Sequence, residues 1–223
     1  MTMLSCRTAG RLILAVALYV ASVYTAMHVV EPEFDPIRTP MSIYVLGPHG
    51  AWMTTTYFAL CAAWIGIAYG FAQTLTRTRL TAIAFFLLVI ALVGALIAGV
   101  FPMDPLTTGQ PADALASEWG GGTMTFAGRM HAGGAPIAFP AIALTPLLFS
   151  LAFRSAPRWR TVFVPALALA SGVLVALALA IVSLRVFGFA GYVQRVFFLL
   201  LLSWMIVVGR QLTRFPTVIG NPS

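Results

Sequence analysis

The stretch LTAIAFFLLVIALVGALIAGVF, residues 80–101, decides the fold because it is long, apolar and free of charged residues. A helix needs about 20 consecutive apolar residues to cross the hydrocarbon core of a bilayer. Five other stretches are similar in length and composition, and the six predicted spans lie near 11–30, 51–74, 80–101, 132–153, 161–184 and 192–209. The sequence therefore predicts an all-α, six-helix transmembrane bundle, with residues 1–223 forming a single integral membrane domain.

The composition excludes an ordinary soluble domain. Hydrophobic residues make up 60% of the chain and charged residues 9%, with a mean hydropathy of +0.94, whereas soluble domains are about 25% charged. The net charge of +7 comes from 13 basic residues, all of them arginine and scattered over short loops. Nucleic-acid binding needs basic residues clustered on one face. We therefore expect membrane lipids as partners, and no nucleic acid.

The arginines predict the orientation, because cytoplasmic loops of membrane proteins are enriched in basic residues. With six spans, four arginines lie on one side: Arg38, Arg129, Arg185 and Arg195. The other nine lie on the opposite side: Arg7, Arg11, Arg77, Arg79, Arg154, Arg158, Arg160, Arg210 and Arg214. This pattern predicts a multi-pass protein of the bacterial inner membrane with both termini in the cytoplasm. The outer side then carries two long connections, 31–50 and 103–130, with a short helix expected at 111–119.

Polar residues gather at the outer ends of the predicted spans. The main ligand-binding candidates, taken from three span ends, are Asp104, Arg129, His131, Gln194 and Arg195. Secondary candidates from the first connection are Glu33, Asp35 and His49, whereas His28 reads as a boundary side chain at the end of the first span. Any one of these groups could simply anchor a helix end at the interface. Their joint occurrence favours an outer polar pocket, since ionisable residues inside a membrane are usually functional.

Arg195 is the most informative of these residues. It is followed at once by VFFLLLL, which places its guanidinium about one turn inside the last span. A charge at this depth needs a partner or must reach water. Asp104 lies at a similar depth on another span, and arginine pairs well with a carboxylate. We therefore expect Asp104 and Arg195 to lie within about 10 Å of each other, the Debye length at about 0.1 M salt.

Proline and glycine shape two of the spans. Pro136, Pro140 and Pro146 each remove a backbone donor from the fourth span, so that helix is expected to be kinked or partly broken. Gly66 and Gly70 form a GxxxG motif in the second span, a spacing that lets helix backbones approach closely. The motif favours packing inside the bundle over the alternative, a homo-oligomer through Gly66 and Gly70.

Three segments resemble a known bacterial membrane family, the domain of unknown function 998. They are AGVFPMDP (98–105), RMHAGGA (129–135) and GYVQRVFFLLLLSW (191–204), and the resemblance extends over most of the chain. It implies that Asp104, His131, Gln194 and Arg195 belong to a polar signature of the family. The family has no established activity, so the resemblance supports the fold and the candidate residues and leaves the function open.

Several functions fit these residues. The first is an outer pocket that binds or moves a lipid or small amphiphile, in which Arg129 and Arg195 contact an anionic headgroup. The second is a metal-dependent hydrolase in which His131, Asp104 and His49 hold zinc and Glu33 acts as a base, although no HExxH motif is present. A haem bound by His49 and His131 and a purely structural role complete the alternatives. The absence of a motif that joins nucleophile and base favours a protein that is not an enzyme, without a cofactor.

Overall fold

The computed structural model describes residues 5–104, 124–186 and 189–215. Within these residues the chain forms six long helices, α1 (Cys6–Val30), α2 (Gly50–Thr74), α3 (Arg79–Val100), α5 (Phe126–Phe153), α6 (Arg160–Val186) and α7 (Ala190–Thr213). Two short 3-10 helices, η1 (Met41–Leu46) and η3 (Pro157–Trp159), lie in the connections. All six long helices are long and apolar enough to cross a membrane, so the chain is an all-helical, multi-pass membrane-type protein.

Polar caps define where several helices begin. The Ser5 side chain accepts a hydrogen bond from the Thr8 backbone N–H, and α1 begins between them at Cys6. Thr78 and Thr81 form a reciprocal capping box at the start of α3. Thr125 caps α5 by accepting from the Gly128 N–H. Such side chains satisfy backbone donors that have no partner in the first helical turn.

Two helices begin five or six residues before the predicted spans, and the second of these differences affects the site. α1 begins at Cys6 rather than near residue 11, and α5 begins at Phe126 rather than near residue 132. The polar segment that contains Arg129 and His131 is therefore helical and is not part of the connection, because Thr125 supplies a cap that extends the helix. The short helix predicted at 111–119 falls outside the described residues.

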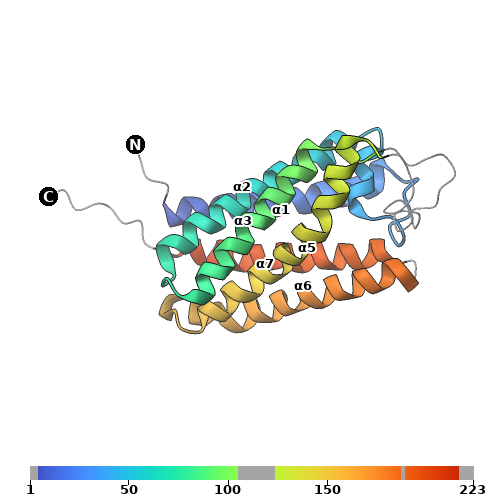
Figure 1. Ribbon diagram of the computed structural model, residues 1–223. Coiled ribbons are helices and arrows are strands. Elements are labelled where there is room, and N and C mark those ends of the chain that lie inside the picture. Colours follow the sequence, from blue (N-terminus) through green and yellow to red (C-terminus); the bar gives the residue numbers. More distant parts are fainter. Residues whose placement is uncertain (1–4, 105–123, 187–188, 216–223) are drawn as a thin grey trace.

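The six helices form a closed ring (Figure 1). Each helix packs against the next one in the sequence, and α7 packs back against α1. The ends of α1, α3 and α6 and the starts of α2, α5 and α7 lie at one end, which we call the loop end. The other end, called the arginine end, holds the start of α1 and the end of α7, and the nine arginines predicted to share one side all lie there.

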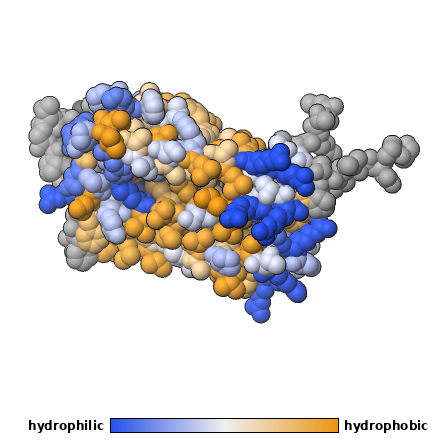
Figure 2. All heavy atoms as spheres, turned by 180° about the vertical axis from the view of Figure 1, so that it is seen from behind, coloured by the Kyte–Doolittle hydropathy of each residue, from blue (hydrophilic) through white to orange (hydrophobic). Residues whose placement is uncertain are grey.

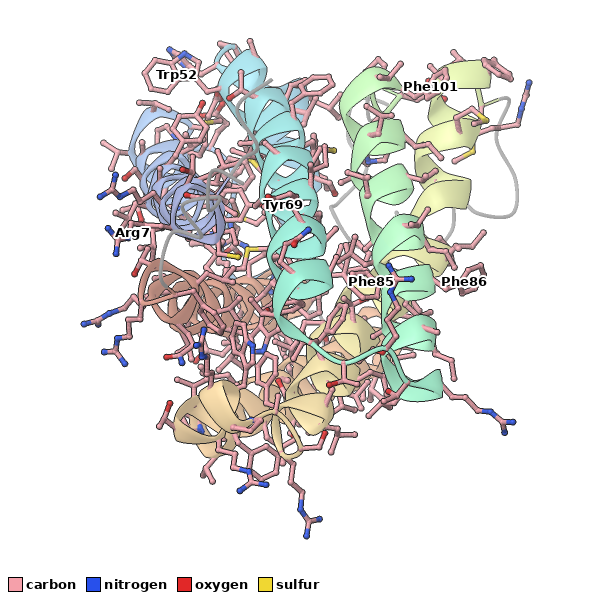
Figure 3. All side chains as sticks on the ribbon, turned by 90° about the vertical axis from the view of Figure 1, so that its left-hand side faces the viewer. Arg7, Trp52, Tyr69, Phe85, Phe86 and Phe101 are labelled. Atoms are coloured by element: carbon pink, nitrogen blue, oxygen red, sulfur yellow. The ribbon has the colours of Figure 1, made fainter. Side chains whose placement is uncertain are left out.

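The surface matches a bilayer. On the face that Figure 2 draws, an apolar band lies between two hydrophilic ends. Large apolar side chains such as Phe86, Val164 and Leu199 are exposed in this band. In Figure 3, Phe86 points away from α3, whereas Phe85 lies on its interior side. Arg7 extends outward from the arginine end. Apolar side chains around the middle and charges at the ends are the pattern that lipid and water together select.

The interior of the arginine end is aromatic. The Phe71 ring of α2 lies 4.5–6.2 Å, between ring centroids, from four others, namely Phe149, Phe153, Trp159 and Trp204. Trp204 also donates a hydrogen bond from its indole N–H to the Ser150 hydroxyl at 2.9 Å. These rings come from α2, α5, η3 and α7, so one cluster joins elements that are distant in sequence.

The glycines and prolines act inside the bundle. Gly66 and Gly70 are buried, Gly66 against Ile13 of α1 and Gly70 against Leu212 of α7. The contacts show the packing role of the motif, and a homo-oligomer through the same glycines stays a prediction. α5 contains Pro136, Pro140 and Pro146 and is one continuous helix. Its two halves point in different directions (Figure 1), so the prolines bend the helix without breaking it.

Candidate functional site

Arg195 organises the largest polar cluster at the loop end. It lies in the second turn of α7 and is half-buried. Its Nε donates to His28 Nε2 at 2.7 Å, and its Nη2 donates to the Tyr44 hydroxyl at 2.9 Å. Its Nη1 donates to two carbonyl oxygens, of Thr39 at 2.8 Å and of Gly191 at 2.9 Å. The guanidinium carbon also lies 5.5 Å from the centre of the Tyr44 ring. Almost all of the guanidinium donors are therefore used within the protein.

These contacts fix the tautomer of His28. Its Nδ1 lies 2.6 Å from the Tyr24 carbonyl oxygen, which can only accept, so Nδ1 carries the hydrogen. Its Nε2 must then be the acceptor of the Arg195 hydrogen bond. His28 lies in the last turn of α1, as expected of a boundary side chain, and it is also a neutral link between α1 and α7. It shares a helix face with Tyr24, one turn earlier, and this spacing was the available signal.

Gln194 and its neighbours hold the first connection against α7. The Gln194 Oε1 accepts a hydrogen bond from the Met41 N–H at 2.5 Å, and the Tyr192 N–H donates to the Ile37 carbonyl at 2.9 Å. A Cβ atom at Gly191 would lie 2.5 Å from the Thr39 carbonyl oxygen, so only glycine permits this approach. The structure thus brings Gln194 and Arg195 together, as anchors of the 31–49 segment.

Glu31 and His49 link the end of α1 to the start of α2. Glu31 is fully buried, and its Oε1 accepts from the His49 backbone N–H at 2.6 Å and lies 3.1 Å from His49 Nδ1. Burial by itself would raise the pKa of the Glu31 carboxyl, but the hydrogen bonds and the charge of His49 outweigh it and lower this pKa. The candidate list did not include Glu31, because its position directly after an apolar span resembles an ordinary helix end.

The two acidic candidates of the 31–49 segment are exposed. Glu33 and Asp35 both lie at the surface. Asp35 accepts a hydrogen bond from the Ile37 N–H at 2.8 Å and lies 3.9 Å from the Arg38 Nε. Exposed ion pairs of this kind contribute little to stability. Among the described residues no hydrogen bond joins either of them to Arg195, and their roles as ligands stay predictions.

Asp104 caps α5 and does not pair with Arg195. Its carboxylate accepts hydrogen bonds from both the backbone N–H, at 2.8 Å, and the hydroxyl of Thr125. The same carboxylate contacts Gly128 so closely that a Cβ atom there would overlap it. Among the described residues no ion pair joins Asp104 to Arg195, and their expected proximity within about 10 Å stays a prediction. A carboxylate at a helix N-terminus is stabilised by the exposed N–H groups, so the contacts of Asp104 with Thr125 do not need a guanidinium partner.

His131 and Arg129 lie on different faces of α5. His131 is buried, 9% exposed, and its Nδ1 lies 2.9 Å from the carbonyl oxygen of Phe101, the residue that ends α3. The Tyr57 ring of α2 lies edge-on to the imidazole, with centroids 6.4 Å apart. Arg129 is exposed, and its one hydrogen bond within the described residues goes from Nη1 to the Met124 carbonyl at 2.8 Å.

The predicted zinc ligands have three separate sets of partners. His49 contacts Glu31, Asp104 contacts Thr125, and His131 contacts Phe101. Across residues 5–104, 124–186 and 189–215, no three side chains of histidine, cysteine, aspartate or glutamate come together in a way that could hold a metal ion. The geometry of the described residues does not support a zinc site. Haem binding by His49 and His131 stays an untested prediction.

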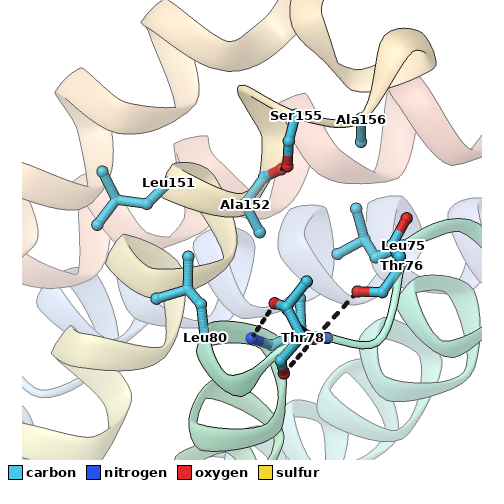
Figure 4. Close-up of a pocket in the computed structure, with 9 residues that line it drawn as sticks. Leu75, Thr76, Thr78, Leu80, Leu151, Ala152, Ser155 and Ala156 are labelled. Atoms are coloured by element: carbon cyan, nitrogen blue, oxygen red, sulfur yellow. Dashed lines mark hydrogen bonds between the residues drawn. The ribbon is translucent and has the colours of Figure 1, made fainter.

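A small cavity lies at the arginine end, away from all of the candidate residues (Figure 4). Its volume is about 60 Å³, and it lies between the α2–α3 connection and the end of α5. Thr81 and Ser155 line it, and both hydroxyls donate to backbone carbonyl oxygens, of Thr76 and Ala152. Its polar lining is therefore engaged in local hydrogen bonds of the two connections.

Comparison with known proteins identifies the family. No curated protein and no solved structure matches the chain. Residues 13–211 match the family described as "Protein of unknown function (DUF998)". The match spans all six helices, and it includes His28, Gln194, Arg195 and the Asp104–Thr125 cap. The chain therefore belongs to the DUF998 family, whose activity is unknown.

Proposed function

We propose that the protein binds an anionic amphiphile, a lipid with a phosphate headgroup, on the outer face of α5 through Arg129. We also propose that it lies in the bacterial inner membrane with both termini in the cytoplasm, because nine arginines mark the arginine end and cytoplasmic ends are rich in basic residues. The loop end is then the outer end. Arg129 lies three residues inside α5, about 5 Å along the helix axis, near headgroup depth.

The difference between two arginines carries the proposal. Arg195 donates four hydrogen bonds inside the protein, whereas Arg129 donates one within the described residues and is exposed. An arginine has five N–H donors that suit phosphate oxygens. Arg129 therefore has donors available for a headgroup. Arg195, which the sequence suggested as a second contact, instead holds neighbouring elements of the protein together.

The helix face below Arg129 suits an acyl chain. Arg129, Gly133 and Ile137 recur at helical spacing on one face, and Phe126 lies on the same face one turn closer to the loop end; all four are exposed, with Phe126 63% and Ile137 64% exposed. A Cβ atom at Gly133 would meet nothing within 4 Å, so the surface is notched there. An apolar, notched strip directly below a cation matches a lipid with a charged head and a flexible chain.

The test compares two arginines at the same end of the bundle. The protein is reconstituted in nanodiscs of phosphatidylcholine with a minor fraction of phosphatidylglycerol, transferred to mild detergent, and its retained lipids are counted by native mass spectrometry. Wild type and Arg38→Gln are expected to retain phosphatidylglycerol, because Arg38 lies in the 31–49 segment rather than on a long helix and is close to Asp35. Arg129→Gln is expected to lose it. Equal retention in all three, or equal loss in both variants, would refute the proposal.

A second variant tests the contact with the acyl chain of the lipid. Gly133→Leu fills the notch and leaves Arg129 in place, so it is expected to reduce retention of phosphatidylglycerol while the protein stays folded. Unchanged retention would show that the face below Arg129 does not contact the lipid. Circular dichroism of each variant confirms that helix content is preserved.

A further inference from the structure

Two buried polar atoms at the loop end have no partner. His131 and Tyr57 are each only 9% exposed. The His131 Nε2 and the Tyr57 hydroxyl have no hydrogen-bond partner in the part of the chain that the structure describes. The described side-chain atoms that are completely closed off from solvent and have no hydrogen-bond partner include the Tyr24 hydroxyl. They do not include His131 Nε2 or the Tyr57 hydroxyl. Both atoms therefore stay reachable for a small polar group.

The hydrogen bond to Phe101 determines what His131 offers. The Phe101 carbonyl oxygen only accepts, so His131 Nδ1 carries a hydrogen, and in the neutral ring Nε2 presents a lone pair. The Tyr57 hydroxyl can donate as well as accept. The centroids of the two rings lie 6.4 Å apart, edge to face, so an acceptor on α5 and a donor on α2 belong to neighbouring rings. Only one ring nitrogen of His131 is used by the fold.

The depth of the pair makes its unpaired state costly. Tyr57 lies seven residues after the start of α2 and His131 five residues after the start of α5, about 8–10 Å along their helices. Both side chains are buried there, and a buried polar group without a hydrogen-bond partner is unfavourable. Such groups in a natural membrane protein call for an explanation, and a ligand that pairs with both of them supplies one.

The surroundings select an uncharged ligand. In the described residues neither side chain contacts a charged group, and the groups beside Tyr57 include the Tyr24 phenol and Thr56. A charged headgroup would lack a counter-ion at this place. The site is separate from Arg129, which lies on the exposed face of α5. We infer that His131 and Tyr57 bind the head of an uncharged, hydroxyl-bearing amphiphile, with a ligand hydroxyl donating to His131 Nε2 and Tyr57 donating to a ligand oxygen.

The experiment observes His131 directly. Protein labelled with ¹⁵N-histidine is placed in phosphatidylcholine nanodiscs, and the His131 nitrogens are assigned by comparison with His131→Gln. Monooleoylglycerol, an uncharged amphiphile with two hydroxyls, is titrated into the lipid, and its di-O-methyl ether serves as the matched probe without donors. Monooleoylglycerol is expected to shift the Nε2 resonance and to saturate, whereas the ether leaves it unchanged. The Nδ1 resonance, held by Phe101, reports whether the local fold is intact.

Two conservative variants separate binding from packing. Tyr57→Phe keeps the ring and removes one donor, so the apparent affinity is expected to fall about fivefold, the effect of one neutral hydrogen bond. Tyr24→Phe removes a sealed hydroxyl and is expected to leave the affinity unchanged. Equal shifts with both amphiphiles, a Tyr57→Phe titration that matches wild type, or an Nε2 resonance that is already hydrogen-bonded and unmoved by monooleoylglycerol, as with a resident water, would each overturn the inference.

Discussion

The two ends of the bundle are held together by different interactions. At the arginine end, Phe71 lies at the centre of an aromatic cluster contributed by four elements, and the charged residues stay on the surface. At the loop end, Arg195 and Glu31 are half-buried or buried and bind neighbouring elements by hydrogen bonds. One end is closed by packed rings and the other by polar side chains that reach backbone groups.

This difference follows from how the two ends connect their helices. At the arginine end the connections are short, 75–78 between α2 and α3 and 154–159 between α5 and α6, so rings can pack tightly across them. The loop end carries the longer 31–49 segment, whose backbone groups need partners that helices do not supply. Within lipid, apolar burial drives helix association only weakly, so packing and hydrogen bonds do most of the work. The arginine end is therefore held mainly by packing and the loop end mainly by hydrogen bonds.

Phe71→Ala is expected to have the largest effect, because it removes the central ring of the arginine end. Its loss leaves a cavity among four aromatic rings, and we expect a decrease in the free energy of unfolding of about 3 kcal/mol. Reversible unfolding by sodium dodecyl sulfate in mixed micelles, followed by circular dichroism, measures this change. A decrease below about 1 kcal/mol would show that the arginine end is not held by aromatic packing.

Arg195→Gln is expected to rank second and to act at the loop end. It removes hydrogen bonds to His28, Tyr44 and the Thr39 carbonyl, for an expected loss of about 2–3 kcal/mol. Hydrogen exchange should rise in the 31–49 segment and stay unchanged near Phe71. Arg195→Lys, which keeps the charge and lacks the planar fork, should show nearly the same rise. Exchange that rises equally at both ends would contradict a division between them.

The Glu31–His49 pair predicts a pH dependence confined to the loop end. The pKa of Glu31 is lowered below its ordinary value of 4.5, so the ionised form is favoured in the folded protein. Its stabilisation is fully present above pH 4.5 and is lost as the pH falls through the lower, folded-state pKa. Glu31→Gln should reduce stability at neutral pH by about 1–2 kcal/mol and flatten the acid limb of the stability curve. An unchanged acid limb in the variant would assign it to another carboxyl.

Phe86→Ala is expected to have the smallest effect. Phe86 is 66% exposed and points away from α3 (Figure 3), so its removal exchanges one lipid-facing apolar group for another. The expected change in the free energy of unfolding is within about 0.5 kcal/mol. This variant is the matched control for Phe71→Ala in the same unfolding assay. A larger loss would mean that Phe86 packs against a second protein chain.

The helices could be predicted from the sequence because long apolar runs carry a strong signal. The run at 80–101 differs from α3, Arg79–Val100, by one residue at each end. The start of α5 was missed because RMHAGG reads as a polar, flexible stretch, and its helical state depends on Thr125 and on the Asp104 carboxylate brought from another part of the chain. Hydropathy contains no information about such a cap.

The candidate site was predicted in part. Gln194 and Arg195 do lie in one cluster, but the partner of Arg195 is His28 rather than Asp104. Charge complementarity suggested a carboxylate, whereas a neutral imidazole and carbonyl oxygens satisfy the guanidinium. The spacing of Tyr24 and His28 places both on one face of α1, but the spacing alone does not show which helix packs against that face. The neighbours of His28 therefore became known only when α1 and α7 were seen to pack together.

The pair of hydrogen bonds between Asp104 and Thr125 has a practical consequence for engineering. It ties together the two points at which the chain leaves α3 and enters α5, so the span between them begins and ends at fixed positions whatever its length. Each doubling of the number of residues between two fixed chain positions costs only about 0.6 kcal/mol of loop-closure entropy. An affinity tag or fluorescent protein inserted between residues 105 and 123 should leave the bundle intact, and the Thr125→Val variant should lose that tolerance.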